Sequence, residues 1–67
     1  MYSNLKAEMA RKNITIKLLS EMTNIPYTTL QSKIKGLREF TINEGLIIKN
    51  ALGVDLPLDF LFIKEEI

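Results

Sequence analysis

The sequence predicts an all-α fold: a compact single domain of five short helices. Breaker residues cut the 67-residue chain into short segments, apolar residues recur within them at helical spacing, and no segment sustains the alternation typical of strands. Residues 1–67 are one domain by length, and such a chain buries only about 60% of its unfolded surface. With no cysteine and no histidine, it lacks disulfides and the usual metal ligands. Close helix packing or a second copy must therefore stabilise it.

The first two helices are predicted from their caps. The first is expected to begin at Ser3 or Asn4 and to end at Asn13. The second has Thr15 as its N-cap and runs to about Thr23. Apolar residues three or four apart should face the core, namely Leu5 and Met9 with Ala10 beside them on the first helix, and Leu19 and Met22 on the second.

The third helix is expected to run from Pro26 to Lys35. Asn24 precedes it at a tight turn, since asparagine tolerates a left-handed backbone, and proline is favoured at a first helical position. Gly36 ends the helix as a C-terminal glycine. Leu30 and Ile34 face inward. The side chains left on the outer face are those of Tyr27, Thr28, Gln31, Ser32 and Lys35.

The fourth helix has the strongest start signal. Thr41 and Glu44 form a capping box, in which each side chain accepts a backbone N–H of the other residue, and Gly53 ends the helix. Gly45 weakens this helix by about 1 kcal/mol relative to alanine, which suggests tight packing there. A fifth helix begins near Pro57. The expected inward residues are Ile42, Ile48 and Leu52 on the fourth helix, and Leu58, Leu61 and Phe62 on the fifth.

Charge is divided unevenly along the chain. Residues 1–38 hold seven basic and two acidic side chains, a balance of +5, whereas residues 39–67 hold two basic and six acidic ones, a balance of −4. This polarity suggests that the first half meets a polyanion while the acidic half faces away from it. Ordinary helical surface charge accounts for the polarity equally well.

The second and third helices form a unit of two short helices around a turn, with a polar outer face on the second of them and further helices behind. In this arrangement the sequence resembles the small phage and bacterial repressors of the lambda-repressor and Cro type, a helix-turn-helix family. The resemblance covers residues 5–62. It rests on an ordered set of pieces, LSEMTNI at 19–25, TTLQSKIKG at 28–36, EFTI at 39–42 and ALGV at 51–54 leading to Leu61 and Phe62.

The resemblance implies a sequence-specific regulator of transcription that binds double-stranded DNA and reads the major groove with the helix from Pro26 to Lys35. It places four side chains nearest the base edges, those of Tyr27, Thr28, Gln31 and Ser32. It assigns phosphate contacts to Thr15, Lys17, Lys33, Lys35 and Arg38. Because no arginine stands among the base-reading positions, we expect a modest affinity or an A·T-leaning site.

Surplus apolar residues raise two further expectations. Phe60, Ile63 and Ile67 are candidates for a two-fold interface in a homodimer, although scattered exposed apolar residues are normal. Ile16 stands where the family often has a polar glutamine that touches phosphate. Ile16, Leu18 and Leu37 therefore leave open an alternative function, in which the fold binds another regulator protein.

Other function classes are not expected. Without histidine or a metal-ligand cluster we predict no catalytic residue, no metal and no cofactor, and no small-molecule site is visible. No apolar run approaches the roughly 18 residues of a membrane span, and the first residues do not resemble a signal peptide. We therefore expect a cytoplasmic protein of a bacterial cell, possibly encoded by a phage.

Overall fold

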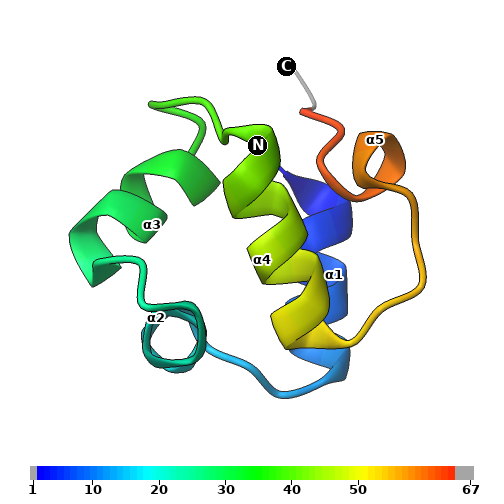
Figure 1. Ribbon diagram of the computed structural model, residues 1–67, viewed down its shortest axis with the longest axis horizontal. Helices are drawn as coiled ribbons and strands as arrows, with labels where there is room; N and C mark the ends of the chain where they lie inside the picture. The colour runs from blue at the N-terminus through cyan, green and yellow to red at the C-terminus, as the bar shows by residue number, and fades with distance from the viewer. Residues whose placement is uncertain (1, 65–67) are drawn as a thin grey trace.

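Five helices form the structure, a computed structural model that describes residues 2–64 (Figure 1). They are α1 (Ser3–Arg11), α2 (Ile16–Thr23), α3 (Tyr27–Ile34), α4 (Ile42–Leu52) and α5 (Leu58–Leu61), and the described residues contain no strand. The predicted all-α class and the order of helices are confirmed. None of the helices in this range has the length and hydropathy needed to cross a membrane.

The predicted caps fix the helix ends. The Thr15 hydroxyl accepts the Leu18 N–H at 3.1 Å, so Thr15 is the N-cap of α2. At the start of α4 the capping box is complete, with Thr41 Oγ1 accepting the Glu44 N–H at 3.1 Å and Glu44 Oε1 accepting the Thr41 N–H at 2.9 Å. Gly53 ends α4 with a φ of 67°, a backbone conformation that glycine adopts without strain.

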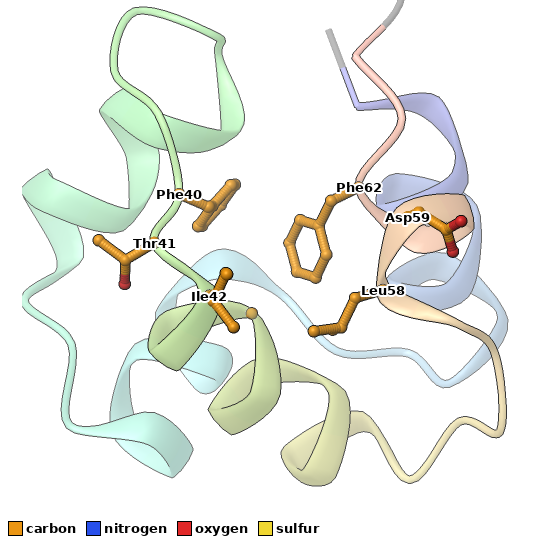
Figure 2. Close-up of a pocket in the computed structure, with 7 residues that line it drawn as sticks. Phe40, Thr41, Ile42, Leu58, Asp59 and Phe62 are labelled. Atoms are coloured by element: carbon orange, nitrogen blue, oxygen red, sulfur yellow. The ribbon is translucent and has the colours of Figure 1, made fainter.

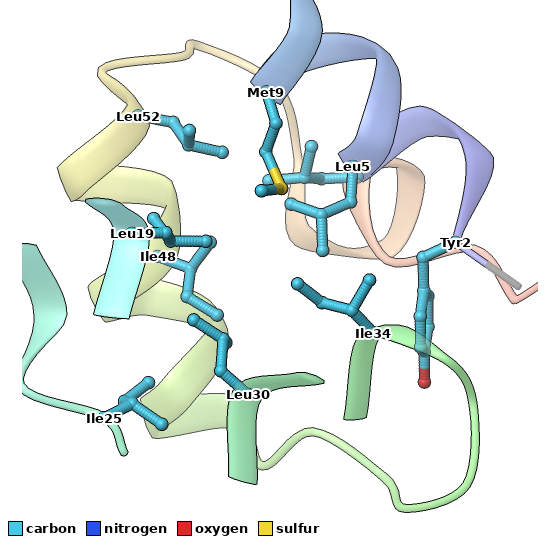
Figure 3. Close-up of a cluster of buried hydrophobic side chains, with 10 residues drawn as sticks. Tyr2, Leu5, Met9, Leu19, Ile25, Leu30, Ile34, Ile48 and Leu52 are labelled. Atoms are coloured by element: carbon cyan, nitrogen blue, oxygen red, sulfur yellow. The ribbon is translucent and has the colours of Figure 1, made fainter. Parts of the chain in front are cut away.

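All five helices contribute to one hydrophobic core (Figure 3). Half-buried side chains, among them Ile16, Phe40 and Phe62, pack around its edge. The buried apolar side chains are those of Tyr2, Leu5, Met9, Leu19, Ile25, Leu30, Ile34, Ile48, Leu52 and Leu61.

Three residues expected to face inward lie on the surface. Met22 is 45% exposed, because the inward stripe of α2 steps four residues from Leu19 to Thr23 and not three. Ile42 is 77% exposed. Six residues separate it from buried Ile48, which at about 100° per residue turns it away from the core. Ala10 is exposed because it lies one residue, and so about 100°, beyond Met9.

Three aromatic rings join the two ends of the described chain to the loop before α4. Tyr2 meets Phe40 and Phe62 edge-on at centroid distances of 5.2 and 6.2 Å, and Phe40 lies 5.0 Å from Phe62. Each such contact adds about 0.5–1.5 kcal/mol beyond the burial of apolar area. The cluster therefore holds the N-terminal segment and the end of α5 against the loop between α3 and α4.

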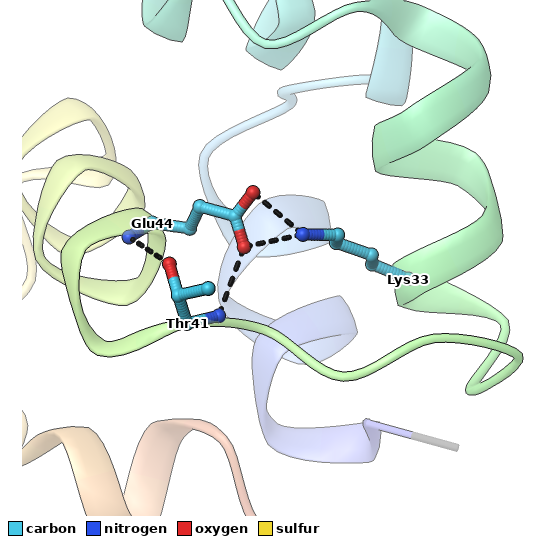
Figure 4. Close-up of polar contacts among 3 residues, drawn as sticks. All are labelled: Lys33, Thr41 and Glu44. Atoms are coloured by element: carbon cyan, nitrogen blue, oxygen red, sulfur yellow. Dashed lines mark hydrogen bonds and ion pairs between the residues drawn. The ribbon is translucent and has the colours of Figure 1, made fainter.

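A buried ion pair connects α3 to the start of α4 (Figure 4). Lys33 Nζ on α3 donates to both carboxylate oxygens of Glu44, at 2.5 and 2.6 Å, and Glu44 Oε1 also accepts the Thr41 N–H. The Lys33 side chain is only 8% exposed. One carboxylate thus ties together α3, the loop and the first turn of α4.

The pair also shifts the acidity of Glu44. Burial raises the pKa of this carboxyl, but the hydrogen bonds from Lys33 and Thr41 together outweigh burial and leave the pKa below its ordinary value. The ionised carboxylate is therefore the form that the fold favours.

Replacing Lys33 with Met should lower the free energy of unfolding at neutral pH by about 1–3 kcal/mol, because Glu44 keeps a half-buried carboxylate without its cation. Exposed Lys35, changed to Met, is the matched control and should cost little. Urea denaturation of both variants at pH 7 measures the two effects. Equal stability of Lys33→Met and the unchanged protein would show that the pair contributes nothing.

The same pair should make stability depend on pH. Because the pKa of Glu44 is lower in the folded than in the unfolded chain, its contribution is complete above the ordinary value of about 4.3 and is lost as pH falls through the lowered folded value. The stability difference between the unchanged protein and Lys33→Met should therefore shrink as pH falls below the ordinary value of about 4.3. A difference that stays constant below that pH would contradict the assignment.

Candidate nucleic-acid interface

The turn between α2 and α3 sets how the two helices meet. Asn24 takes the left-handed conformation expected from the sequence, with φ 60° and ψ 19°. Thr23 Oγ1 donates to the Leu19 carbonyl at 2.7 Å and accepts the Ile25 N–H at 3.3 Å, while Ser20 Oγ donates to the Ile25 carbonyl at 2.6 Å. The Ile25 side chain is also buried, so hydrogen bonds to its backbone and packing of its side chain together fix the turn.

The outer face of α3 carries the four predicted base-reading side chains. Tyr27, Thr28, Gln31 and Ser32 occupy helix positions i, i+1, i+4 and i+5, so they share one face of α3. Tyr27 and Thr28 are exposed, and Gln31 and Ser32 are half-buried. The helix lies at one edge of the molecule, with its inner side against α2 and the core (Figure 1). The structure thus brings these four polar side chains together on a rigid element.

Three basic side chains predicted to contact phosphate are exposed on α2 and just after α3. Lys17, Lys35 and Arg38 are exposed, and none of them forms an ion pair with an acidic side chain within residues 2–64. The cap hydrogen bond of Thr15 uses its hydroxyl as an acceptor, which leaves the hydroxyl hydrogen free to donate to a phosphate.

Lys33 differs from the expectation of a phosphate contact. Its ammonium is buried against Glu44 at the start of α4, because position 33 lies beside Leu30 and Ile34, the two buried apolar residues of α3. Lys33 therefore lies outside the candidate interface and ties α3 to the start of α4.

Lys64 is a residue that sequence reasoning missed. Its Nζ donates to the Gly36 carbonyl at 3.0 Å and lies 3.5 Å from a carboxylate oxygen of Glu39. It thereby joins the segment after α5 to the loop after α3. No local pattern predicts this contact, since 28 residues separate Lys64 from Gly36.

The apolar residues proposed from the sequence as protein-binding sites differ in exposure in the structure. Ile16 is half-buried against the core, so core packing explains why this position is not polar, whereas Leu18 and Leu37 are exposed. Of the expected dimer residues, Phe60 and Ile63 are exposed, and Ile67 lies outside the described residues. The alternative of a protein partner at Ile16, Leu18 and Leu37 therefore loses the residue that favoured it.

Comparisons with known proteins identify no relative of the chain. No protein-family model matches the chain, and no curated protein or solved structure is significantly similar to it.

Replacing Asn24 with Ala should lower the free energy of unfolding by about 1–2 kcal/mol, since a Cβ without a hydrogen-bonding group is strained in the left-handed region. Asn24→Gly should avoid this loss because glycine adopts positive φ freely. Asn50→Ala, at an exposed position within α4, is the control and should cost nothing. Urea denaturation compares the three, and an Asn24→Ala protein as stable as Asn24→Gly would refute the strain argument.

Proposed function

We propose that the protein is a sequence-specific regulator of transcription that binds double-stranded DNA, with α2, the Asn24 turn and α3 acting as a helix-turn-helix. One observation carries this proposal. Four polar side chains share the outer face of α3, and the neighbouring segments of the chain, α2 and the loop after α3, carry the exposed cations Lys17, Lys35 and Arg38, which form no ion pair with an acidic side chain within residues 2–64.

The chemistry of the α3 face suits base edges in the major groove. Gln31 can bind adenine with two hydrogen bonds, one donated and one accepted, and the Thr28 and Ser32 hydroxyls can donate or accept. The Tyr27 ring and the Thr28 methyl group can contact the methyl group of thymine. Because the face contains no arginine, the commonest contact to guanine is missing, and we propose a site rich in A·T pairs.

Phosphate binding is assigned to the ends of the same two helices. The N-terminus of α2, with the Thr15 hydroxyl and Lys17, offers donors and positive charge at one side of the face. Lys35 and Arg38 follow α3 at its other end. These two groups would position α3 without reading sequence.

The proposed regulator acts by occupying DNA, as phage and bacterial repressors do, in the bacterial cytoplasm. We propose that two copies bind a two-fold symmetric operator, because each copy offers only a short reading face. Occupancy alone would then block polymerase or a competing regulator.

Selection of bound sequences from a random duplex library, at two salt concentrations, tests the proposal directly. We expect enrichment of a two-fold symmetric, A·T-rich motif whose half-sites lie about one helical turn apart. Binding should weaken steeply between about 50 and 200 mM salt, because phosphate contacts release counterions. No enriched motif, or a complex that does not respond to salt, would refute sequence-specific DNA binding.

Single substitutions separate the two kinds of contact. Arg38→Ala should weaken binding to all sequences and reduce the slope of log K against log salt by about 0.9, whereas Ser32→Ala or Thr28→Val should change the preferred base at one position. Lys6→Ala on α1, which lies away from α3 in Figure 1, is the control and should change neither. Equal losses on selected and random DNA for all three variants of the interface would contradict this division of roles.

A further inference from the structure

The segment after α5, residues 62–64, is bonded to the loop between α3 and α4, residues 35–41. Lys64 Nζ donates to the Gly36 carbonyl at 3.0 Å and lies 3.5 Å from a carboxylate oxygen of Glu39. Gly36 and Glu39 stand on either side of Leu37 and Arg38 in the chain. One lysine side chain therefore spans the part of the loop that carries Arg38, which is assigned above to a phosphate contact.

The start of this loop is fixed by the end of α3. The Gly36 N–H donates to the Lys33 carbonyl at 3.0 Å, and Gly36 has a φ of 86°. The Leu37 N–H donates to the Ser32 carbonyl, also at 3.0 Å. These two bonds form a Schellman motif, a common way for a helix to end. They use the N–H groups of the turn and leave the Gly36 carbonyl to accept from Lys64.

The end of the loop is fixed by aromatic packing. The Phe40 and Phe62 ring centroids lie 5.0 Å apart, and both rings contact Tyr2. The same two rings border an apolar groove of about 360 Å³ between the start of α4 and α5, so packing holds them on one side only (Figure 2). Lys64, two residues after Phe62, holds the segment beyond the rings.

The Lys64 side chain is held close to the protein. It is only 33% exposed, whereas the side chain of Glu39 is 80% exposed. An exposed ion pair contributes little by itself. A hydrogen bond from an ammonium is stronger than one between neutral groups, so the Gly36 carbonyl is the partner that fixes Lys64. The contact therefore fixes the loop locally and adds little to the stability of the whole fold.

Lys64 also changes the charge of the loop. Residues 39–67 contain only two basic side chains, those of Lys49 and Lys64. The fold brings Lys64 to Glu39, which directly follows Arg38. A free carboxylate at this point would repel phosphate, and the cation beside it offsets that repulsion.

We propose that Lys64 is a positioning residue for DNA binding. Its bond to Gly36 holds the loop in the conformation in which Arg38 meets phosphate, and its charge offsets that of Glu39, while Lys64 itself does not touch DNA. Lys64 lies outside residues 5–62, the part of the chain that resembles the repressor family. The inference rests on the proposed function, because Arg38 has a phosphate role only in a protein that binds DNA.

Binding to a labelled duplex of mixed sequence, followed by fluorescence anisotropy between about 50 and 200 mM salt, tests the proposal. The variants are Arg38→Ala, Lys64→Met and the double variant. Each should weaken binding about threefold or more and lower the slope of log K against log salt by about 0.9, because all three lose the same phosphate contact. Lys64→Arg keeps the charge and the donors and should bind like the unchanged protein. Lys12→Met, at the exposed end of α1, removes the same charge and should leave the slope unchanged.

Hydrogen exchange gives a second readout that contains no DNA. In Lys64→Met the amides of Gly36 and Leu37 should exchange faster, because the turn that holds them has lost its tie to the segment after α5. The amides of buried Leu30 and Ile48, and the free energy of unfolding in urea, should stay as in the unchanged protein.

Three results would overturn the positioning role and leave DNA binding intact. The first is a Lys64→Met variant that binds the duplex as tightly as the unchanged protein. The second is a slope lowered by about 1.8 in the double variant, twice the value for one contact, which would show that Lys64 binds phosphate itself. The third is unchanged exchange of the Gly36 and Leu37 amides. An unchanged protein that does not bind the duplex at any of these salt concentrations would instead overturn the proposed function and this inference together.

Discussion

One carboxylate, that of Glu44, links α3 to the loop after it and to the first turn of α4. The Glu44 carboxylate accepts hydrogen bonds from Lys33 Nζ on α3 and from the Thr41 N–H in the loop. It therefore connects the first turn of α4, the loop and α3. Burying two charges costs solvation energy, which three short hydrogen bonds here offset. Apolar packing alone is not directional. Together with the Asn24 turn, the pair therefore specifies how α3 lies on the core, and with it the direction in which the outer face of α3 points.

Burial of apolar side chains in one small core supplies the remaining stability. Residues from every helix meet in one cluster, and the Tyr2, Phe40 and Phe62 rings extend it to both ends of the described chain. Large aromatic side chains bury much area for each ordered residue. The aromatic rings at the edge of the core thus bury apolar area that the small core alone does not provide.

Local signals predicted the helices, and three-dimensional packing decided the exceptions. Thr15, Asn24, Thr41 and Gly53 act through hydrogen bonds and backbone angles within a few residues, so their roles follow from sequence. Lys33 was misassigned because lysine usually lies on the surface, although its place between Leu30 and Ile34 on the core side of α3 was a signal that could have shown it. The apolar groove between the start of α4 and α5 could not be predicted from local sequence. Its lining residues Phe40, Gly45 and Phe62 come together only through the packing of α5 on α4.

The candidate DNA face and the apolar groove lined by Phe40, Gly45, Leu58 and Phe62 lie on different elements. α3 and the N-terminus of α2 carry the polar and basic groups, while the groove is built from the start of α4 and from α5. Because the Lys33–Glu44 pair links α3 to the first turn of α4, the start of α4 contributes to the direction in which the outer face of α3 points.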